Sequence, residues 1–187
     1  ALFDICNTGN RQKDGSRLIF SPQQQSLITE IADIIVPDTD TPGAKAAGVG
    51  PFITMMIAEC YPAKAREVFM KGLAGVNDRA EDRFGKSFMQ LSAGERNQVI
   101  KTIADDTAKL KAEDKKADAG KPKGVVTNSK GAKPKSKPYF FAIMRDLTLL
   151  GYFTSETGAS KALVYVAVPG RYDGCIDLKP GQKAWAI

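Results

Sequence analysis

The chain reads PYFFAIMRDLTLLGYFT over residues 138–154, and this stretch predicts the helix around which the rest of the protein is arranged. Its large apolar side chains recur at intervals of three and four residues, the period of a helix with a buried face. Pro138 can occupy the first helical position, where its missing N–H costs nothing. Gly151 can take the left-handed conformation that closes a helix. The apolar positions are Phe140, Phe141, Ile143, Met144, Leu147 and Leu150.

The same period predicts four further helices upstream, over residues 22–36, 51–60, 63–84 and 93–110. Ser21 and Gln24 form a capping-box pattern before the first, and Ser92 and Glu95 form another before the fourth. Cys60 continues the apolar spacing of the second helix and is expected to be a buried thiol. After the last helix, the apolar run 164–168 predicts a short strand, followed by a turn at residues 169–170.

The predicted fold class is therefore mainly α: an irregular bundle of about five helices with long loops and at most a short strand pair near the C-terminus. Residues 1–20 are mixed and polar, and we expect an N-terminal arm there. Residues 21–187 are expected to form a single helical domain with a Lys-rich, mobile insertion at 112–137.

The positive charge of the chain is concentrated in one segment. The formal net charge is +6, yet ten lysines and only three carboxylates lie between Lys109 and Lys137, so the remainder carries about −1. The segment has several Gly and Pro residues and few apolar ones, which favours a solvated loop. The alternative is a polycation that docks onto an acidic partner or a membrane surface. No aromatic residues are interleaved for base stacking, so nucleic acid is not an expected partner.

The sequence offers little for catalysis. It contains no histidine, which removes the commonest general base, the serine and cysteine triads and most zinc sites. No dinucleotide fingerprint or phosphate-binding loop is present. Adjacent carboxylates such as Asp105 and Asp106 diverge on a helix. We therefore expect no catalytic, cofactor-binding or metal-binding residues in this chain. No apolar run approaches the roughly 18 residues of a membrane-spanning helix.

The cysteines leave several possibilities open. Cys6 and Cys175 lie in loop-like terminal segments. In an oxidising compartment they could pair with each other, or one could bridge to a partner chain, and the remaining alternative is two unpaired thiols.

Three stretches carry a resemblance to a known family: IADIIVPDTDTPGAKAAGV at 31–49, FFAIMRDLTLLGYFTSETG at 140–158 and VPGRYDGC at 168–175. Together they resemble the gluconate 2-dehydrogenase subunit 3 family, which supplies small subunits of FAD-dependent sugar and glucoside dehydrogenases. The resemblance covers residues 22–88 and 138–185. The last two stretches are closer to small subunits paired with flavoproteins of the glucoside 3-dehydrogenase type.

The resemblance implies a non-catalytic small subunit that binds and stabilises a flavoprotein of the glucose-methanol-choline type and supports its export. FAD would lie in that partner and haem c in a cytochrome c subunit, with none in this chain. The implied location is the periplasm, reached through a twin-arginine signal that is absent from the given sequence.

Such a subunit needs aromatic and Arg anchors for its partner. The candidates are Tyr152, Phe153, Arg171, Tyr172 and Trp185, which lie in expected loop or tail segments. Tyr152 and Phe153 could instead fill the core of this chain.

Two other hypotheses remain at this point. One is a free-standing helical adaptor that docks onto an acidic partner through its Lys-rich loop. The other is an autonomous enzyme with carboxylate or tyrosine chemistry.

Overall fold

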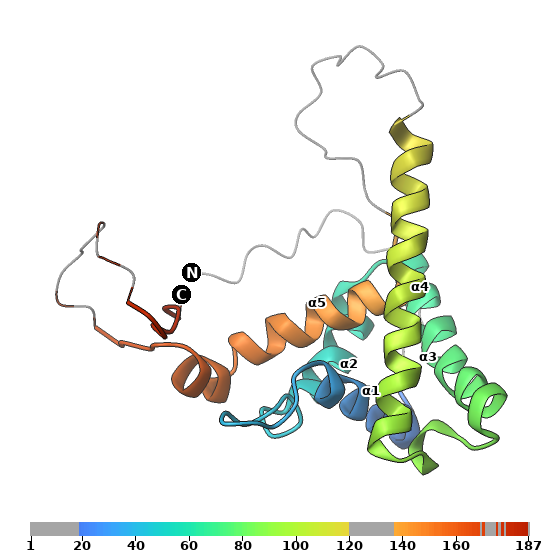
Figure 1. Cartoon of the computed structure of the whole chain (residues 1–187), viewed down its shortest axis with the longest axis horizontal. Coiled ribbons are helices and arrows are strands. Elements are labelled where there is room, and N and C mark those ends of the chain that lie inside the picture. Colours follow the sequence, from blue (N-terminus) through green and yellow to red (C-terminus); the bar gives the residue numbers. More distant parts are fainter. Residues whose placement is uncertain are drawn as a thin grey trace.

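A computed structural model describes residues 19–119, 137–168, 170, 175, 177 and 179–186. The described part is mainly helical, which confirms the predicted fold class (Figure 1). Its α-helices are α1 (Pro22–Ile35), α2 (Val49–Cys60), α3 (Ala63–Phe84), α4 (Ala93–Ala119) and α5 (Phe140–Phe153), with short helical turns η2 (Phe88–Gln90) and η3 (Gly158–Ala162). In place of the expected strand pair, Val164 and Trp185 form one isolated parallel bridge.

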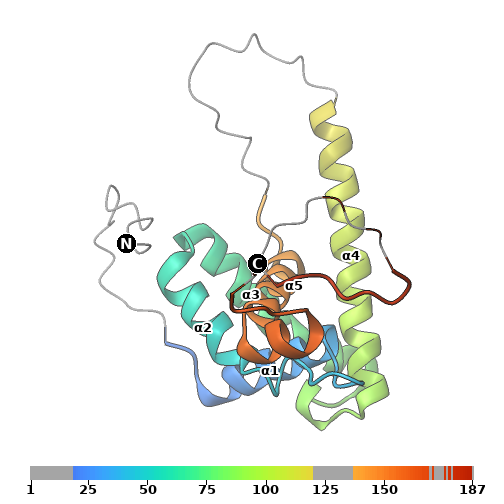
Figure 2. The ribbon, with the colours of Figure 1, turned by 90° about the vertical axis from the view of Figure 1, so that its left-hand side faces the viewer.

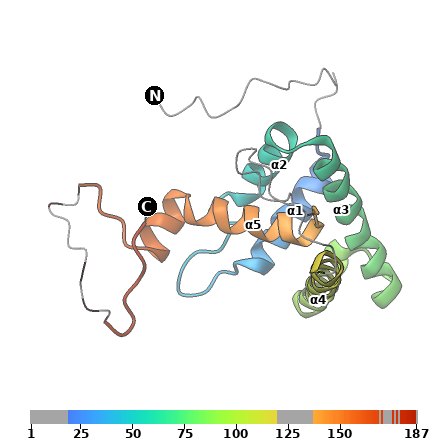
Figure 3. The ribbon, with the colours of Figure 1, turned by 90° about the horizontal axis from the view of Figure 1, so that it is seen from above.

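Helix α5 is the centre of the bundle, because it contacts each of the four other α-helices. Figures 1 and 3 show it running through the bundle, with α4 crossing it at a steep angle. Phe140 opens the buried face of α5 and packs against Phe69 of α3, with ring centroids 5.3 Å apart. The buried residues of α5 are Phe140, Ile143, Met144, Leu147, Thr148, Gly151 and Tyr152. The hydroxyl of Thr148 donates to the carbonyl of Met144 at 2.8 Å, so its polarity is satisfied inside the core.

Both ends of α5 differ from the expectation. Tyr139 is the N-cap and Phe140 the first helical residue, so Pro138 lies outside the helix. At the other end the helix continues through Gly151 to Phe153. Gly151 is required for another reason: a Cβ there would lie 2.6 Å from Cδ1 of Phe52 on α2. The absent side chain lets α2 and α5 approach closely, whereas the predicted role was a left-handed cap.

Both predicted capping boxes are confirmed. At α1, Ser21 Oγ accepts from the Gln24 N–H, and Gln24 Oε1 accepts from the Ser21 N–H. At α4, the Ser92 N–H and hydroxyl both donate to the Glu95 carboxylate, at 2.8 and 2.7 Å. These bonds favour the charged carboxylate and lower the pKa of Glu95.

Helix α2 begins earlier than predicted. Gly48 is its N-cap and takes a left-handed conformation with φ of 69°. Pro51 is therefore the third helical residue, where a missing N–H still costs no hydrogen bond. The prediction for Cys60 was wrong, because this thiol is exposed. Cys60 is the last residue of α2, and the buried stripe of that helix stops at Ile57.

Helix α4 is longer than the sequence indicated. It continues beyond Leu110 to Ala119, so residues 112–119 of the expected insertion are helical. Ala, Lys and Glu favour helix, and no Gly or Pro interrupts the chain until Gly120 and Pro122. Figure 2 shows this end of α4 extending past the other helices. Residues 120–136 lie outside the described part.

Polar contacts join the base of that segment. The Lys137 ammonium pairs with Asp114 at 2.5 Å, and the hydroxyl of Tyr139 donates to the other oxygen of Asp114. The ammonium of Lys111 lies 5.7 Å from the centre of the Tyr139 ring. The end of α4 and the residues before α5 are therefore tied together, whatever lies between them.

A second polar cluster ties α1 to α4 and to the loop before α2. Glu30 accepts from Lys45 and, at 2.9 Å, from Arg96. The hydrogen bond to Glu30, reinforced by its charge, raises the pKa of Lys45. Tyr152 anchors the same loop from the other side, because its hydroxyl donates to the carbonyl of Pro42 at 2.7 Å.

Two glycines of α3 provide a matched test of the packing. A Cβ at Gly72 would lie 2.2 Å from Cγ of Phe140, whereas at Gly75 no atom of the described chain lies within 4 Å. We expect Gly72→Ala to lower the free energy of unfolding by about 1–3 kcal/mol through overpacking. Gly75→Ala should raise it by about 0.5–1 kcal/mol, because alanine loses less backbone entropy. Urea unfolding of both variants measures this, and equal effects would contradict the packing.

The Tyr152 hydroxyl provides a second test. Tyr152→Phe should lower the free energy of unfolding by about 0.5–1.5 kcal/mol, because the Pro42 carbonyl loses its donor. Tyr165→Phe is the control, since Tyr165 is 62% exposed and its hydroxyl should contribute within about 0.5 kcal/mol. Thermal melting of the two variants compares them directly, and an unchanged Tyr152→Phe protein would refute the anchoring role.

Candidate partner interface

Tyr152 does not project from the molecule. Only 2% of its surface is exposed, and its hydroxyl is bonded inside the chain to Pro42. Of the two roles that the sequence left open, the structure gives Tyr152 the one in the core. Its side chain therefore supports the end of α5 from within and is not free to insert into a partner.

Phe153, the next residue, faces outward and is 42% exposed. Its ring meets that of Tyr152 edge to face, with centroids 5.2 Å apart, so the buried tyrosine holds it in place. Leu149 and Leu150 are exposed on the same last turns of α5. We call these three residues, Leu149, Leu150 and Phe153, the end face of α5.

After η3 the described residues belong to no helix or strand, and two of them, Val164 and Trp185, form the isolated bridge. We call these described residues, 163–168, 170, 175, 177 and 179–186, the C-terminal arm. Figures 1 and 3 show the arm extending from the end of α5, away from the rest of the bundle.

The arm folds back on itself at its root. The N–H of Val164 donates to the carbonyl of Ala184 at 2.8 Å, and the N–H of Ala186 donates to the carbonyl of Val164 at 2.9 Å. The ammonium of Lys183 also donates to the carbonyl of Lys161, at 2.6 Å. These bonds bring Trp185 next to Val164 from about twenty residues later in the chain.

The arm exposes large apolar side chains. Trp185 is 53% exposed and Val168 is 82% exposed. Tyr165 and Val166, which follow Val164 directly in the chain, are exposed as well. Single exposed hydrophobic residues scattered over a surface are normal in soluble proteins, but several on one short segment make that segment a candidate binding surface.

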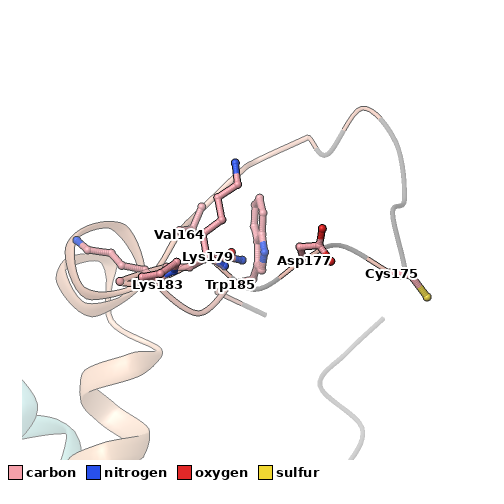
Figure 4. A pocket seen from close by; sticks show the side chains of 9 residues that line it. Val164, Cys175, Asp177, Lys179, Lys183 and Trp185 are labelled. Carbon is pink, nitrogen blue, oxygen red and sulfur yellow. Dashed lines mark hydrogen bonds between the residues drawn. The ribbon is translucent and has the colours of Figure 1, made fainter.

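An open hollow of about 760 Å³ lies along the arm (Figure 4). Val164 and Trp185 supply its apolar part, and Asp177, Lys179 and Lys183 supply its polar part. In Figure 4 the Cys175 sulfur points away from these side chains. The hollow therefore combines an aromatic ring with charged groups of both signs.

The remaining predicted interface residues, Arg171 and Tyr172, lie outside the described part of the chain. So does Cys6, and the three possibilities for Cys6 and Cys175, a mutual disulfide, a bridge to a partner chain or two unpaired thiols, stay open. Among the described residues Cys60 and Cys175 are free, exposed thiols.

The structure adds five interface candidates that the sequence analysis did not select. Leu149 and Leu150 belong to an apolar helix, and the helical period alone does not tell which of its faces lacks a neighbour. The run 164–168 was assigned to a strand, where half of the side chains would be covered. The added residues are Leu149, Leu150, Tyr165, Val166 and Val168.

Two searches for other kinds of site give no candidate in the described part of the chain. It contains no group of three or more Cys, Asp or Glu side chains placed to hold a metal ion. None of its helices is both long and apolar enough to cross a lipid bilayer.

One of three comparisons with known proteins gives a match, and it covers the stretches at 31–49 and 140–158 but only residues 168–170 of the third stretch. Comparisons with curated proteins and with solved structures give no match. The family model described as gluconate 2-dehydrogenase subunit 3 matches residues 22–170, which include all five α-helices and the first residues of the arm. The chain therefore belongs to the gluconate 2-dehydrogenase subunit 3 family.

Proposed function

We propose that this chain is the non-catalytic small subunit of a periplasmic, FAD-dependent sugar dehydrogenase of the gluconate 2-dehydrogenase or glucoside 3-dehydrogenase type. Its role is to bind and stabilise the catalytic flavoprotein, which belongs to the glucose-methanol-choline class, and to support its export. FAD is held by that flavoprotein, and a cytochrome c subunit takes up the electrons. Family membership supports the accessory role.

The observation that carries the proposal is the set of exposed apolar residues on the end face of α5 and on the arm that follows it through η3. Stable interfaces between subunits are large and apolar at their centre, with aromatic residues as anchors. Phe153 and Trp185 are two such anchors, and Phe153 is fixed by a buried neighbour. Because Phe153 is already held by the Tyr152 ring, it loses little conformational entropy when a partner binds.

The lack of histidine in the whole sequence supports the non-catalytic assignment. Oxidation of an alcohol by a flavin needs a group that accepts the hydroxyl proton, and histidine is the side chain best suited to this near neutral pH. The proton acceptor is therefore assigned to the flavoprotein.

The interface can be tested by co-expressing the chain with its FAD-binding subunit and purifying through a tag on the chain. The double variant Phe153→Ala/Trp185→Ala should weaken binding by more than about tenfold, because each change removes an aromatic anchor. Met89→Ala is the matched control. The exposed fraction of Met89, 41%, is similar to the 42% of Phe153, but Met89 lies in η2, outside the proposed interface. Surface plasmon resonance gives the affinities. Equal affinities for wild type and the double variant would exclude this interface.

The alternative adaptor function depends on the Lys-rich segment and predicts the opposite result for a deletion. Asp114 and Lys137 hold the base of the segment together, so residues 120–136 can be replaced by a short Gly-Ser linker. The proposed subunit should keep its flavoprotein after this change, with an affinity within about threefold of wild type. An adaptor would lose its acidic partner after this replacement, and before it the affinity of the intact chain would fall steeply as salt is raised. Loss of the flavoprotein on deletion would favour the adaptor.

A further inference from the structure

The bridge at the root of the arm leaves an open backbone edge. In an extended chain the N–H and C=O groups of successive residues point to opposite sides. Val164 uses both of its groups on Ala184 and Ala186. Those of Tyr165 therefore point to the other side, and within the described part of the chain no residue pairs with them.

Unpaired edges of this kind are a liability that folded proteins usually cover or blunt. Here the edge is flanked by Tyr165, Val166 and Val168, which are 62, 45 and 82% exposed. A single bridge of two residues is also too small to be stable by itself in water. Both facts point to a third extended segment that completes the pairing, and none is found among the described residues.

The charges beside the edge indicate what this segment carries. Lys179 and Lys183 lie on the arm and Lys161 lies at its root, all three exposed. Asp177 is the one carboxylate in the described part of the arm. The ammonium of Lys183 is held by the Lys161 carbonyl, whereas no described residue forms an ion pair with Lys179. The local excess of positive charge favours a segment with acidic side chains.

We propose that the flavoprotein adds an extended segment with at least one carboxylate side chain to the arm, paired through the N–H and C=O of Tyr165. Recognition through an added strand draws affinity from main-chain hydrogen bonds and specificity from the flanking side chains. Tyr165 and Val168 supply the apolar contacts, and Lys179 supplies the ionic one. This inference rests on the proposed function and names how the interface is built.

Proline substitutions at neighbouring positions test the pairing, because proline removes one N–H without preventing an extended backbone. Tyr165→Pro removes the donor at the proposed edge, and Val166→Pro removes one that points to the other side. Each is compared with alanine at the same position, which accounts for the lost side chain. The complex with the co-expressed FAD-binding subunit is the assay, with wild type as reference.

We expect Tyr165→Pro to bind at least about tenfold more weakly than Tyr165→Ala, the loss that one or two main-chain hydrogen bonds produce. The affinities of Val166→Pro and Val166→Ala for the FAD-binding subunit should agree within about threefold. Circular dichroism checks that α-helix content is unchanged in all four variants. If proline and alanine at position 165 bind equally while the complex forms, the strand pairing is wrong and the proposed function stands. If wild type forms no complex, the proposed function is refuted, and the pairing with it.

Hydrogen exchange of the wild-type complex gives a second readout that needs no substitution. The Tyr165 amide should exchange at least about tenfold more slowly than the Val166 amide, because only the first is paired. Equal exchange rates would overturn the proposal.

The ionic part is tested with Lys179→Glu and Lys179→Gln. The charge reversal should weaken binding more than the neutral variant, and the difference should shrink as salt is raised. Lys101→Glu, an exposed reversal on α4, is the control and should leave the affinity unchanged. Equal binding by both Lys179 variants would remove the acidic side chain from the proposal.

Discussion

The burial of α5 is the constraint on which the rest of the structure depends. This helix contacts every other α-helix, and the aromatic contact between Phe140 and Phe69 joins it to α3. Helices α3 and α5 can approach closely because Gly72 leaves room for Phe140. Helices α2 and α5 can do so because Gly151 leaves room for Phe52. Interiors packed to this density tolerate little added volume. The bundle therefore positions the last turn of α5 firmly, and with it everything that follows.

Firm positioning matters because the proposed surface for a partner begins where this core ends. Tyr152 is bonded to the loop before α2, and Phe153 leans on the Tyr152 ring while facing solvent. An exposed aromatic side chain held by a buried one loses little entropy on binding, which makes it an effective anchor. The arm follows from the same end of α5 through η3 (Figure 1).

The charge of the chain plays a different role from the one that the net value suggests. The described helices carry acids and bases in near balance, and their ion pairs serve local purposes: Glu30 joins α1 to α4, and Asp114 closes the base of the Lys-rich segment. The family is one of dehydrogenase subunits, and recognition of such a partner is assigned here to apolar side chains and main-chain groups. Positive charge on the arm then selects among partners more than it drives binding.

The sequence by itself determined the helices, because apolar period, capping boxes and Gly or Pro breaks act over a few residues: α1 and α3 follow from them directly. It also determined the family, and the family match includes the stretches at 31–49 and 140–158. Only the tertiary structure decided which side chains are covered. Cys60 continues the apolar pattern of its helix and is exposed, whereas Tyr152 lies beyond the expected end of its helix and is buried. The role of Gly151 and the open edge at Tyr165 were decided in the same way. Whether a side chain or a peptide group has a neighbour depends on segments far away in the chain, and local patterning carries no record of them.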